Sequence, residues 1–288
     1  MAKFWRDIRR QWKRSSTVSL VLFVLLMLTV LLLMLLGHGI FSIPISSGED
    51  SIPIRGRKTL DTESEVEGLG QREDQWTEIV SWEPRAFIYH NLLSKEECKY
   101  LIELAKPHMK KSTVVDNETG KSVDSKVRTS TGMFLRRGQD KVVRAIEKRI
   151  ADYTFIPVEN GEQLQVLHYE MGQKYDPHYD YFSDEFNVKN GGQRVATVLM
   201  YLSDVEEGGE TIFPDAKGNI SLVRGWNEMS ECAKKGVSVK PKMGDALLFW
   251  SMRPDATEDP SSLHGACPVI RGNKWSCTKW MHVSEYKV

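Results

Sequence analysis

The sequence lacks several features that would assign it to common protein classes. Its 39 basic and 39 acidic side chains cancel, and no basic excess lies on the part expected to fold, as nucleic-acid binding would require. No Gly-rich phosphate loop occurs, which argues against a nucleotide-using glycosyltransferase. Internal repeats and low-complexity tracts are absent, and a long apolar run occurs once. The 288 residues therefore suit one catalytic domain with short appendages.

The single apolar run, residues 18–36, is interrupted only by Ser19 and Thr29. Its length suffices to cross a hydrocarbon core of about 30 Å. Residues 1–17 carry six basic side chains and one acidic, so +5, which leaves −5 for the remainder. Positive residues mark the cytosolic side, so the rest of the chain is expected in the secretory lumen. A cleaved signal peptide is the alternative, although its apolar core is usually shorter.

A luminal domain is exposed to glycosylation and to oxidising conditions. Two acceptor sequons begin at Asn117 and Asn219. Four cysteines allow three full pairings, and the sequence does not choose between them. Cys232 and Cys267 both lie in turn-rich stretches, which makes them the favoured pair, whereas Cys98 is also explained as a core residue.

The chain divides into four parts by composition. Residues 1–17 form a basic cytosolic tail and residues 18–36 a single transmembrane signal-anchor. Residues 37–78 are polar and acidic without an apolar period, which predicts a flexible luminal stem. Residues 79–288 are expected to fold as the catalytic domain.

Helices come first in that domain, and strands follow. A helix is predicted from Ser94, with Glu97 completing a capping box, and a second over 139–153. Short strands separated by Gly, Pro and Asp turns are then predicted at the following residues: 163–169, 194–202, 210–213, 236–239, 246–250 and 274–283. The predicted fold class is α+β, a double-stranded β-helix (jelly roll) with the N-terminal helices packed on one face.

The chemistry resides in His178 and Asp180, in His264, which follows 84 residues after Asp180, and in Lys274. Residues i and i+2 of a strand point to the same face, so His178 and Asp180 can bind one side of a metal ion. A second imidazole completes a facial triad with three open positions, the ligand set of non-haem Fe(II) oxygenases. Lys274 suits a dicarboxylate co-substrate that needs a cation at its far end.

A lone His-x-Asp pattern is weak, and His168 and Glu170 form a comparable decoy. The surrounding segments distinguish the two. They closely resemble the 2-oxoglutarate-dependent prolyl 4-hydroxylases, and most of all the membrane-anchored plant type, over about residues 80–288. The matching segments are 165–169, 172–182, 208–214, 242–249 and 263–280.

The resemblance implies roles for these residues. His178, Asp180 and His264 would bind Fe(II), Lys274 would neutralise the distal carboxylate of 2-oxoglutarate, and the Tyr169 hydroxyl would hydrogen-bond to it. Thr211 is a weaker candidate for the same carboxylate and is equally explained as an ordinary strand residue. The reaction would use O2 to hydroxylate C4 of a peptidyl proline while 2-oxoglutarate yields succinate and CO2, with L-ascorbate as the reductant.

The expected partner is a proline-rich peptide, because a polyproline II helix docks onto aromatic-lined grooves. The family pattern places Tyr175 and Arg194 near the target proline and Trp280 beside the site. Tyr181 and Trp250 are candidate walls that could equally be core. Arg128 and Ser130 belong to a segment that either lines the groove or is a solvated loop.

The resemblance also implies that substrates are secretory and cell-wall glycoproteins and that the enzyme resides in the endoplasmic reticulum or Golgi membrane. It implies no obligatory partner subunit, and association with other hydroxylases stays open. Hydroxylation of lysine or of a small molecule is the alternative within this chemistry. A jelly-roll binding module without metal is the alternative outside it, against which the intact triad with its lysine argues.

Overall fold

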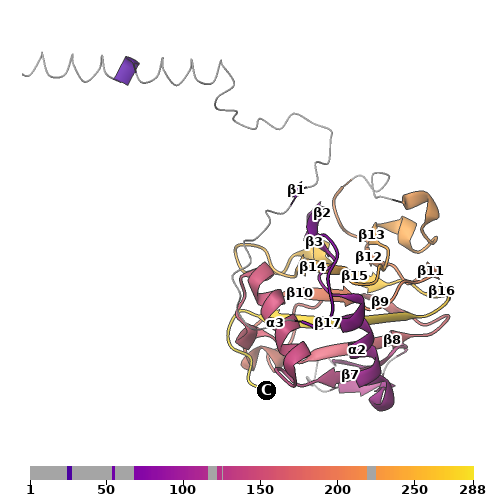
Figure 1. Cartoon of the computed structure of the whole chain (residues 1–288). Helices are drawn as coiled ribbons and strands as arrows, with labels where there is room; N and C mark the ends of the chain where they lie inside the picture. Colours follow the sequence, from indigo (N-terminus) through magenta and orange to yellow (C-terminus); the bar gives the residue numbers. More distant parts are fainter. Residues whose placement is uncertain (1–24, 28–53, 56–67, 116–121, 125, 219–224) are drawn as a thin grey trace, which may run out of the picture. The chain divides into compact units, whose positions relative to one another are not determined.

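The computed structural model describes residues 25–27, 54–55, 68–115, 122–124, 126–218 and 225–288 (Figure 1). Of the expected transmembrane segment, only residues 25–27 are among them, and these are helical and exposed. Within the described part of the chain, no helix reaches the length and apolar content of a membrane span. Asn117 and Asn219, the two sequon asparagines, lie outside the described residues.

Two α-helices form where their caps and apolar stripes predict them. Helix α2 spans Lys95–Ala105, and the Ser94 side chain and Glu97 form the expected capping box. Helix α3 spans Lys141–Thr154 and starts later than predicted because Asp140 takes the N-cap. Short 3-10 turns connect the remaining elements: η1 (Lys106–His108), η2 (Val158–Asn160), η3 (Asn187–Lys189), η5 (Trp226–Glu228), η6 (Ala233–Lys235) and η7 (Pro260–Ser262).

The strands form two main antiparallel sheets. The larger sheet runs β1-β2-β3-β14-β10-β17-β8-β7-β4, with these bounds: β1 (Ile54–Arg55), β2 (Trp76–Trp82), β3 (Arg85–His90), β4 (Lys110–Lys111), β7 (Thr131–Leu135), β8 (Leu164–Tyr169), β10 (Arg194–Tyr201), β14 (Ala246–Trp250) and β17 (Lys274–His282). The smaller sheet runs β13-β12-β15-β9, with β9 (Tyr175–His178), β12 (Thr211–Phe213), β13 (Val237–Val239) and β15 (His264–Ala266). Two ribbons complete the set: β5 (Thr113–Val115) with β6 (Ser122–Asp124), and β11 (Glu207–Gly208) with β16 (Val269–Arg271).

The larger sheet has a helix face and a site face, and period-two alternation assigns each side chain to one of them. On β17, Cys277 and Met281 pack into the main apolar cluster together with Leu101 of α2 and Ile146 of α3. Figure 1 shows both helices lying across this face. The alternate residues of β17, beginning with Lys274, face the other way and line a pocket.

The site face is covered by the smaller sheet. A second apolar cluster joins the two sheets, with Tyr201 and Phe249 from the larger and Phe213 and Val239 from the smaller. Such an enclosed space between two sheets can hold polar side chains away from bulk water. The candidate functional residues lie in this space.

The sequence missed the β2–β3 hairpin, which extends the sheet at one edge. Strand β2 begins at Trp76, ahead of the domain start expected at residue 79, and the Ser94 hydroxyl at the cap of α2 donates to the Leu69 carbonyl. The short strands β4, β5, β6, β7 and β11 were also missed, because so few residues give no readable alternation.

A buried charged group fastens the hairpin to the sheet. His90 of β3 lies 2.8 Å from a carboxylate oxygen of Asp245 and 3.2 Å from one of Glu78, and Trp76 stacks on its ring at 3.7 Å. Burial alone would lower the pKa of His90, but the hydrogen bonds and charges of Asp245 and Glu78 raise it to about 9. The imidazolium therefore joins β2, β3 and the start of β14.

This imidazolium predicts alkaline destabilisation. The folded pKa lies above the unfolded value of about 6.5, so the stabilisation is complete below pH 6.5 and is lost as the pH rises through about 9. Between pH 6.5 and 9.5 the free energy of unfolding should fall by about 3 kcal/mol more in the wild type than in His90→Gln. Denaturant unfolding at several pH values measures this, and parallel pH profiles for the two proteins would contradict it.

Candidate active site

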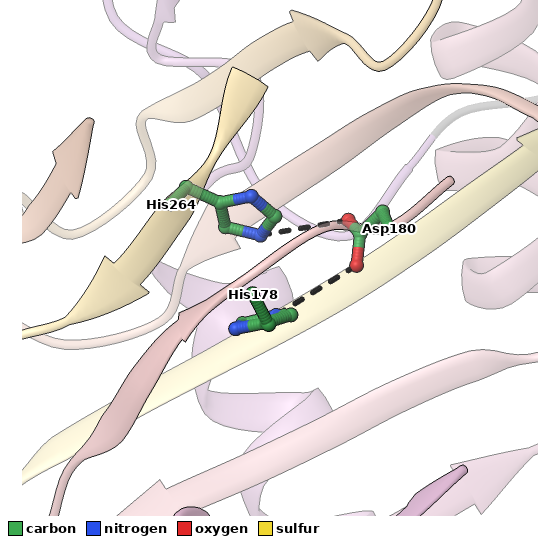
Figure 2. Close-up of side chains that lie close together, drawn as sticks. All are labelled: His178, Asp180 and His264. Atoms are coloured by element: carbon green, nitrogen blue, oxygen red, sulfur yellow. Dashed lines mark ion pairs between the residues drawn. The ribbon is translucent and has the colours of Figure 1, made fainter. Parts of the chain in front are cut away.

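The register of two short strands brings the triad together. In the antiparallel pair β9–β15, His264 lies directly opposite His178, and Asp180 follows two residues after His178. The two Nε2 atoms lie 3.8 Å (His178) and 3.6 Å (His264) from different oxygens of the Asp180 carboxylate. Figure 2 shows both imidazoles turned toward that carboxylate. All three potential ligand atoms lie within 4.8 Å of one another.

Hydrogen bonds fix which nitrogen of each imidazole is free. His178 Nδ1 lies 2.9 Å from the Asp176 carbonyl oxygen, and His264 Nδ1 lies 2.9 Å from the Ser262 carbonyl oxygen. A carbonyl only accepts, so each Nδ1 carries the proton and donates. Each Nε2 then presents its lone pair toward Asp180, which is how metal-binding histidines are oriented.

The spacing and the donors fit a metal ion. The Nε2-to-carboxylate distances exceed hydrogen-bond length, and an ion with bonds of about 2.1 Å would lie between such atoms. Two imidazoles and one carboxylate, with open positions remaining, are the set typical of non-haem Fe(II) oxygenases.

Neighbouring groups hold Asp180 and His178 in the forms that bind a metal ion. Burial alone would raise the pKa of Asp180, but His264, His178 and Arg194 lower it below its usual value. Burial and the nearby His264 lower the pKa of His178, which keeps that imidazole neutral. The Thr197 hydroxyl donates to Asp180 at 2.6 Å. Sequence reasoning missed Thr197, whose only signal is a hydroxyl within an otherwise apolar strand.

Aromatic rings hold both imidazoles in place. The Tyr175 ring stacks on His178 at 3.6 Å, and the Phe249 ring lies 4.4 Å from that of His264. The Arg128 guanidinium in turn lies over the Tyr175 ring, 4.8 Å from its centroid. Ring orientation at the triad is therefore set by packing as well as by hydrogen bonds.

A pocket lined by the triad and by apolar and aromatic side chains opens between the two sheets, which is the type of site that binds small molecules. Lys274 lies in it, is 1% exposed, and donates through Nζ to the Gly209 carbonyl at 2.7 Å. No carboxylate of the described residues forms an ion pair with it. Burial lowers the pKa of Lys274 to about 8, and Glu210 acts in the opposite direction. A buried cation without an ion-pair partner suits an anionic ligand.

Most of the expected residues line this pocket. Tyr169 lies beside Lys274, with its ring centroid 5.4 Å from Nζ. Thr211 also lines the pocket, and its hydroxyl lies 2.9 Å from the Tyr201 hydroxyl. The remaining expected residues in the lining are Tyr175, Arg128 and Trp280.

Arg194 lies just behind the pocket wall. Its guanidinium stacks on the Trp280 ring at 4.1 Å, and its Nε donates to Glu162 at 2.6 Å. Arg194 thus supports the Trp280 ring and is itself held by a buried carboxylate.

Three expected residues lie elsewhere. Ser130 is fully buried and donates to the Ser112 hydroxyl at 3.0 Å, so it does not line the pocket. Trp250 packs on the helix face, with the Arg85 guanidinium 4.6 Å from its ring, and Tyr181 is also absent from the lining. The decoy His168 stacks on Trp275 at 4.1 Å, and both alternate out of the site face. For Trp250 and His168 the position within the strand decides which face the side chain takes, and a single sequence defines this only weakly.

Cys232 and Cys267 are joined by a disulfide, and Cys98 and Cys277 are buried free thiols of the main apolar cluster. The bond connects the loop before β13 to the end of β15, close to His264. Burial raises the pKa of both free thiols, which keeps them protonated.

Comparison with known proteins agrees with this geometry. Residues 164–282, from the start of β8 to the end of β17, match the 2OG-Fe(II) oxygenase superfamily. The chain is 71% identical over 289 residues to "Probable prolyl 4-hydroxylase 3" of Arabidopsis thaliana, covering 100% of both chains. It is 69% identical over 232 residues to "Prolyl 4-hydroxylase 5" of the same plant, covering 81% of this chain and 79% of that one. A crystal structure of a viral collagen prolyl hydroxylase from Paramecium bursaria Chlorella virus-1, in its 2OG complex, is similar with 27% identity and a TM-score of 0.50. That match covers 68% of this chain and 94% of the viral one.

The triad geometry predicts how metal affinity responds to substitution. His264→Ala removes a ligand and should weaken Fe(II) binding more than a hundredfold. Thr197→Val leaves all three ligands but removes the donor to Asp180, and should weaken binding about tenfold. Anaerobic titration with Fe(II) measures both. The exposed Thr257→Val is the matched control, and wild-type affinity in His264→Ala would refute the ligand assignment.

Proposed function

The chain belongs to the plant prolyl 4-hydroxylases of the 2OG-Fe(II) oxygenase superfamily, and from this membership we propose how its own residues divide the reaction. The enzyme hydroxylates C4 of a peptidyl proline. When bound, iron and 2-oxoglutarate supply the oxidising chemistry, in which O2 and 2-oxoglutarate are converted to the new hydroxyl group, succinate and CO2.

Iron would be held by His178 Nε2, an Asp180 oxygen and His264 Nε2. The carbonyls of Asp176 and Ser262 keep each Nε2 unprotonated for this purpose. Three ligands on one side leave positions for the co-substrate and O2. The residues of the triad therefore bind and orient, and none of them needs to transfer a proton.

The co-substrate assignment rests on Lys274. Its ammonium is buried in the same pocket as the triad, and among the described residues its one hydrogen bond is to the neutral Gly209 carbonyl. The distal carboxylate of 2-oxoglutarate would supply the missing negative charge. Tyr169 would add a hydroxyl donor beside it. Thr211 is the weaker candidate, because its hydroxyl already bonds to that of Tyr201.

The peptide would lie over the aromatic part of the pocket. Trp280 and Tyr175 offer flat apolar rings to a polyproline II segment. Arg194 would fix the Trp280 ring, and Arg128, whose guanidinium donates to the Thr113 carbonyl and the Gln165 side chain, would hold the Tyr175 ring. We propose proline-rich secretory and cell-wall glycoproteins as the substrate class.

We extend the proposal to the type of β fold, the cellular location and the reductant. The two facing antiparallel sheets agree with a double-stranded β-helix, as the sequence predicts. The apolar run 18–36, its basic flank and the sequons support a type II protein of the endoplasmic reticulum or Golgi membrane with a luminal catalytic domain. L-Ascorbate is the proposed reductant that keeps the iron ferrous.

The role of Lys274 can be tested by substitution. With the detergent-solubilised full-length protein, Fe(II), ascorbate and poly-L-proline, CO2 release from 2-oxoglutarate should depend on the peptide. Lys274→Ala should raise the KM for 2-oxoglutarate about thirtyfold, because a charge-assisted hydrogen bond is lost, while Lys274→Arg restores part of the affinity. The exposed Lys240→Ala is the control, and an unchanged KM in Lys274→Ala would count against the assignment.

The charge of Lys274 also predicts that the affinity for 2-oxoglutarate depends on pH. Only the protonated ammonium attracts the dicarboxylate, and burial places the pKa of Lys274 at about 8. The dissociation constant of 2-oxoglutarate should therefore be flat below about pH 7.5 and rise by up to tenfold per pH unit above about 8.5. Calorimetric titration of the anaerobic Fe(II) protein from pH 6.5 to 9.5 measures this, and a constant value across the range would contradict it.

A further inference from the structure

Strand β12 borders the co-substrate end of the pocket through Thr211. No role has yet been assigned to the side chains of this segment that face away from the pocket. Along it, Thr211 faces the pocket and Phe213 faces the cluster between the sheets. Ile212 faces the opposite way, into a cluster with Met229 and Ala233. These last two belong to residues 225–236, which we term the disulfide lobe because Cys232 joins them to Cys267. By alternation, Glu210 also faces this lobe.

Glu210 is 2% exposed and firmly held there. Its carboxylate accepts from the Ser230 N–H at 2.9 Å and from the Ser230 hydroxyl at 2.8 Å. Its backbone carbonyl accepts from the Cys267 N–H at 2.8 Å. Among the described residues no lysine, arginine or histidine forms an ion pair with it. A carboxylate buried among neutral donors is costly, and its retention calls for a compensating charge nearby.

Gly209, the residue before Glu210, contacts Lys274 directly. Lys274 Nζ donates to the Gly209 carbonyl at 2.7 Å, and the Gly209 N–H donates to the Pro268 carbonyl at 3.1 Å. Gly209 has φ +70°, a left-handed conformation that favours glycine, and an added Cβ would lie 3.4 Å from Lys274 Cδ. The position of the ammonium thus depends on a backbone turn that is anchored one residue later by Glu210.

We propose that Glu210 is a positioning residue for co-substrate binding: its buried carboxylate anchors Gly209 and Thr211 to the disulfide lobe, so that the Gly209 carbonyl holds the Lys274 ammonium in place for the dicarboxylate, and its negative charge acts on that ammonium. This inference rests on the proposed function of Lys274. It makes the disulfide lobe part of the co-substrate site although the lobe contributes no side chain to the pocket lining.

The charges around Lys274 agree with this role. Burial lowers the pKa of Lys274, and the charge of Glu210 acts in the opposite direction and raises it. The other polar rings around it are neutral phenols: Tyr201, 5.7 Å from Nζ, has its pKa raised by burial, and the pKa of Tyr175 is raised to about 12. The further ionisable groups lining the pocket, from β8, β9, β15 and their flanking segments, are Tyr169, Arg128, His178, Asp180 and His264.

Glu210→Gln separates charge from shape, since the amide oxygen can still accept from the Ser230 N–H. The dissociation constant of 2-oxoglutarate should rise about twofold at pH 6.5 and about tenfold at pH 8, because loss of the Glu210 charge lowers the pKa of Lys274 and leaves less of the ammonium form at the higher pH. Fe(II) affinity and kcat at saturating co-substrate should stay within about twofold. Binding is measured on the anaerobic full-length Fe(II) protein from the visible absorption of the iron–2-oxoglutarate chelate.

Ser230→Ala tests the anchor while keeping the charge. It removes one of the two donors to Glu210 and should raise the dissociation constant about threefold, by a factor that does not change with pH. Glu207→Gln, an exposed carboxylate on β11, is the matched control and should bind as the wild type does.

Three outcomes would overturn the inference. They are a wild-type dissociation constant in Glu210→Gln across the pH range, a loss that is equal at every pH, and wild-type binding in Ser230→Ala. Lys274→Ala, measured in the same way, separates this inference from its premise. If that variant loses binding and Glu210→Gln does not, the inference alone fails; if Lys274→Ala binds normally, the proposed co-substrate site fails.

Discussion

The pairing of β9 with β15 is the constraint on which the site depends. It places His264 directly opposite His178, although the two are far apart in sequence. Because side chains alternate along a strand, a slip of one residue would turn one imidazole away and dissolve the triad. Both strands are short, so their register is held from outside, by the Phe249 ring against His264 and by the pairing of β15 with β12.

The two faces of the larger sheet have different roles, one in stability and one in the pocket. Its helix face contributes apolar burial with α2 and α3, and this stabilises the fold. Its site face can then carry buried polar groups such as Lys274, Thr197 and Trp280, whose desolvation would be costly in a small core. The cost is offset locally by hydrogen bonds and by bound ligands. Charge compensation, rather than shape alone, therefore organises the pocket.

The sequence predicted both helices, because capping residues and apolar stripes are local signals. It also predicted the long strands β10, β14 and β17 within a residue or two. It brought His178, Asp180, His264 and Lys274 together through a recognisable ligand pattern and a family resemblance. Their convergence in one pocket is what the structure adds.

Other features depend on contacts between distant segments and could not be predicted. Thr197 bonds Asp180 only because β10 passes beneath the triad. Both Ser130 and Trp250 were placed near the groove, but Ser130 is buried against Ser112 and the parity of β14 turns Trp250 to the helix face. The role of Glu210 could not be predicted either, because its partner Ser230 lies in the disulfide lobe, which is distant in sequence. Register and parity are properties of the folded sheets, and a single sequence encodes them only weakly.

The central claim is that His178, Asp180 and His264 converge on one ferrous ion. X-ray absorption of the anaerobic Fe(II) protein tests this most directly, because imidazole rings give characteristic outer-shell scattering. The account predicts two imidazoles among light oxygen and nitrogen ligands, no sulfur, and a change in the remaining ligands when 2-oxoglutarate is added. A spectrum with fewer than two imidazoles, or with sulfur bound to iron, would contradict it.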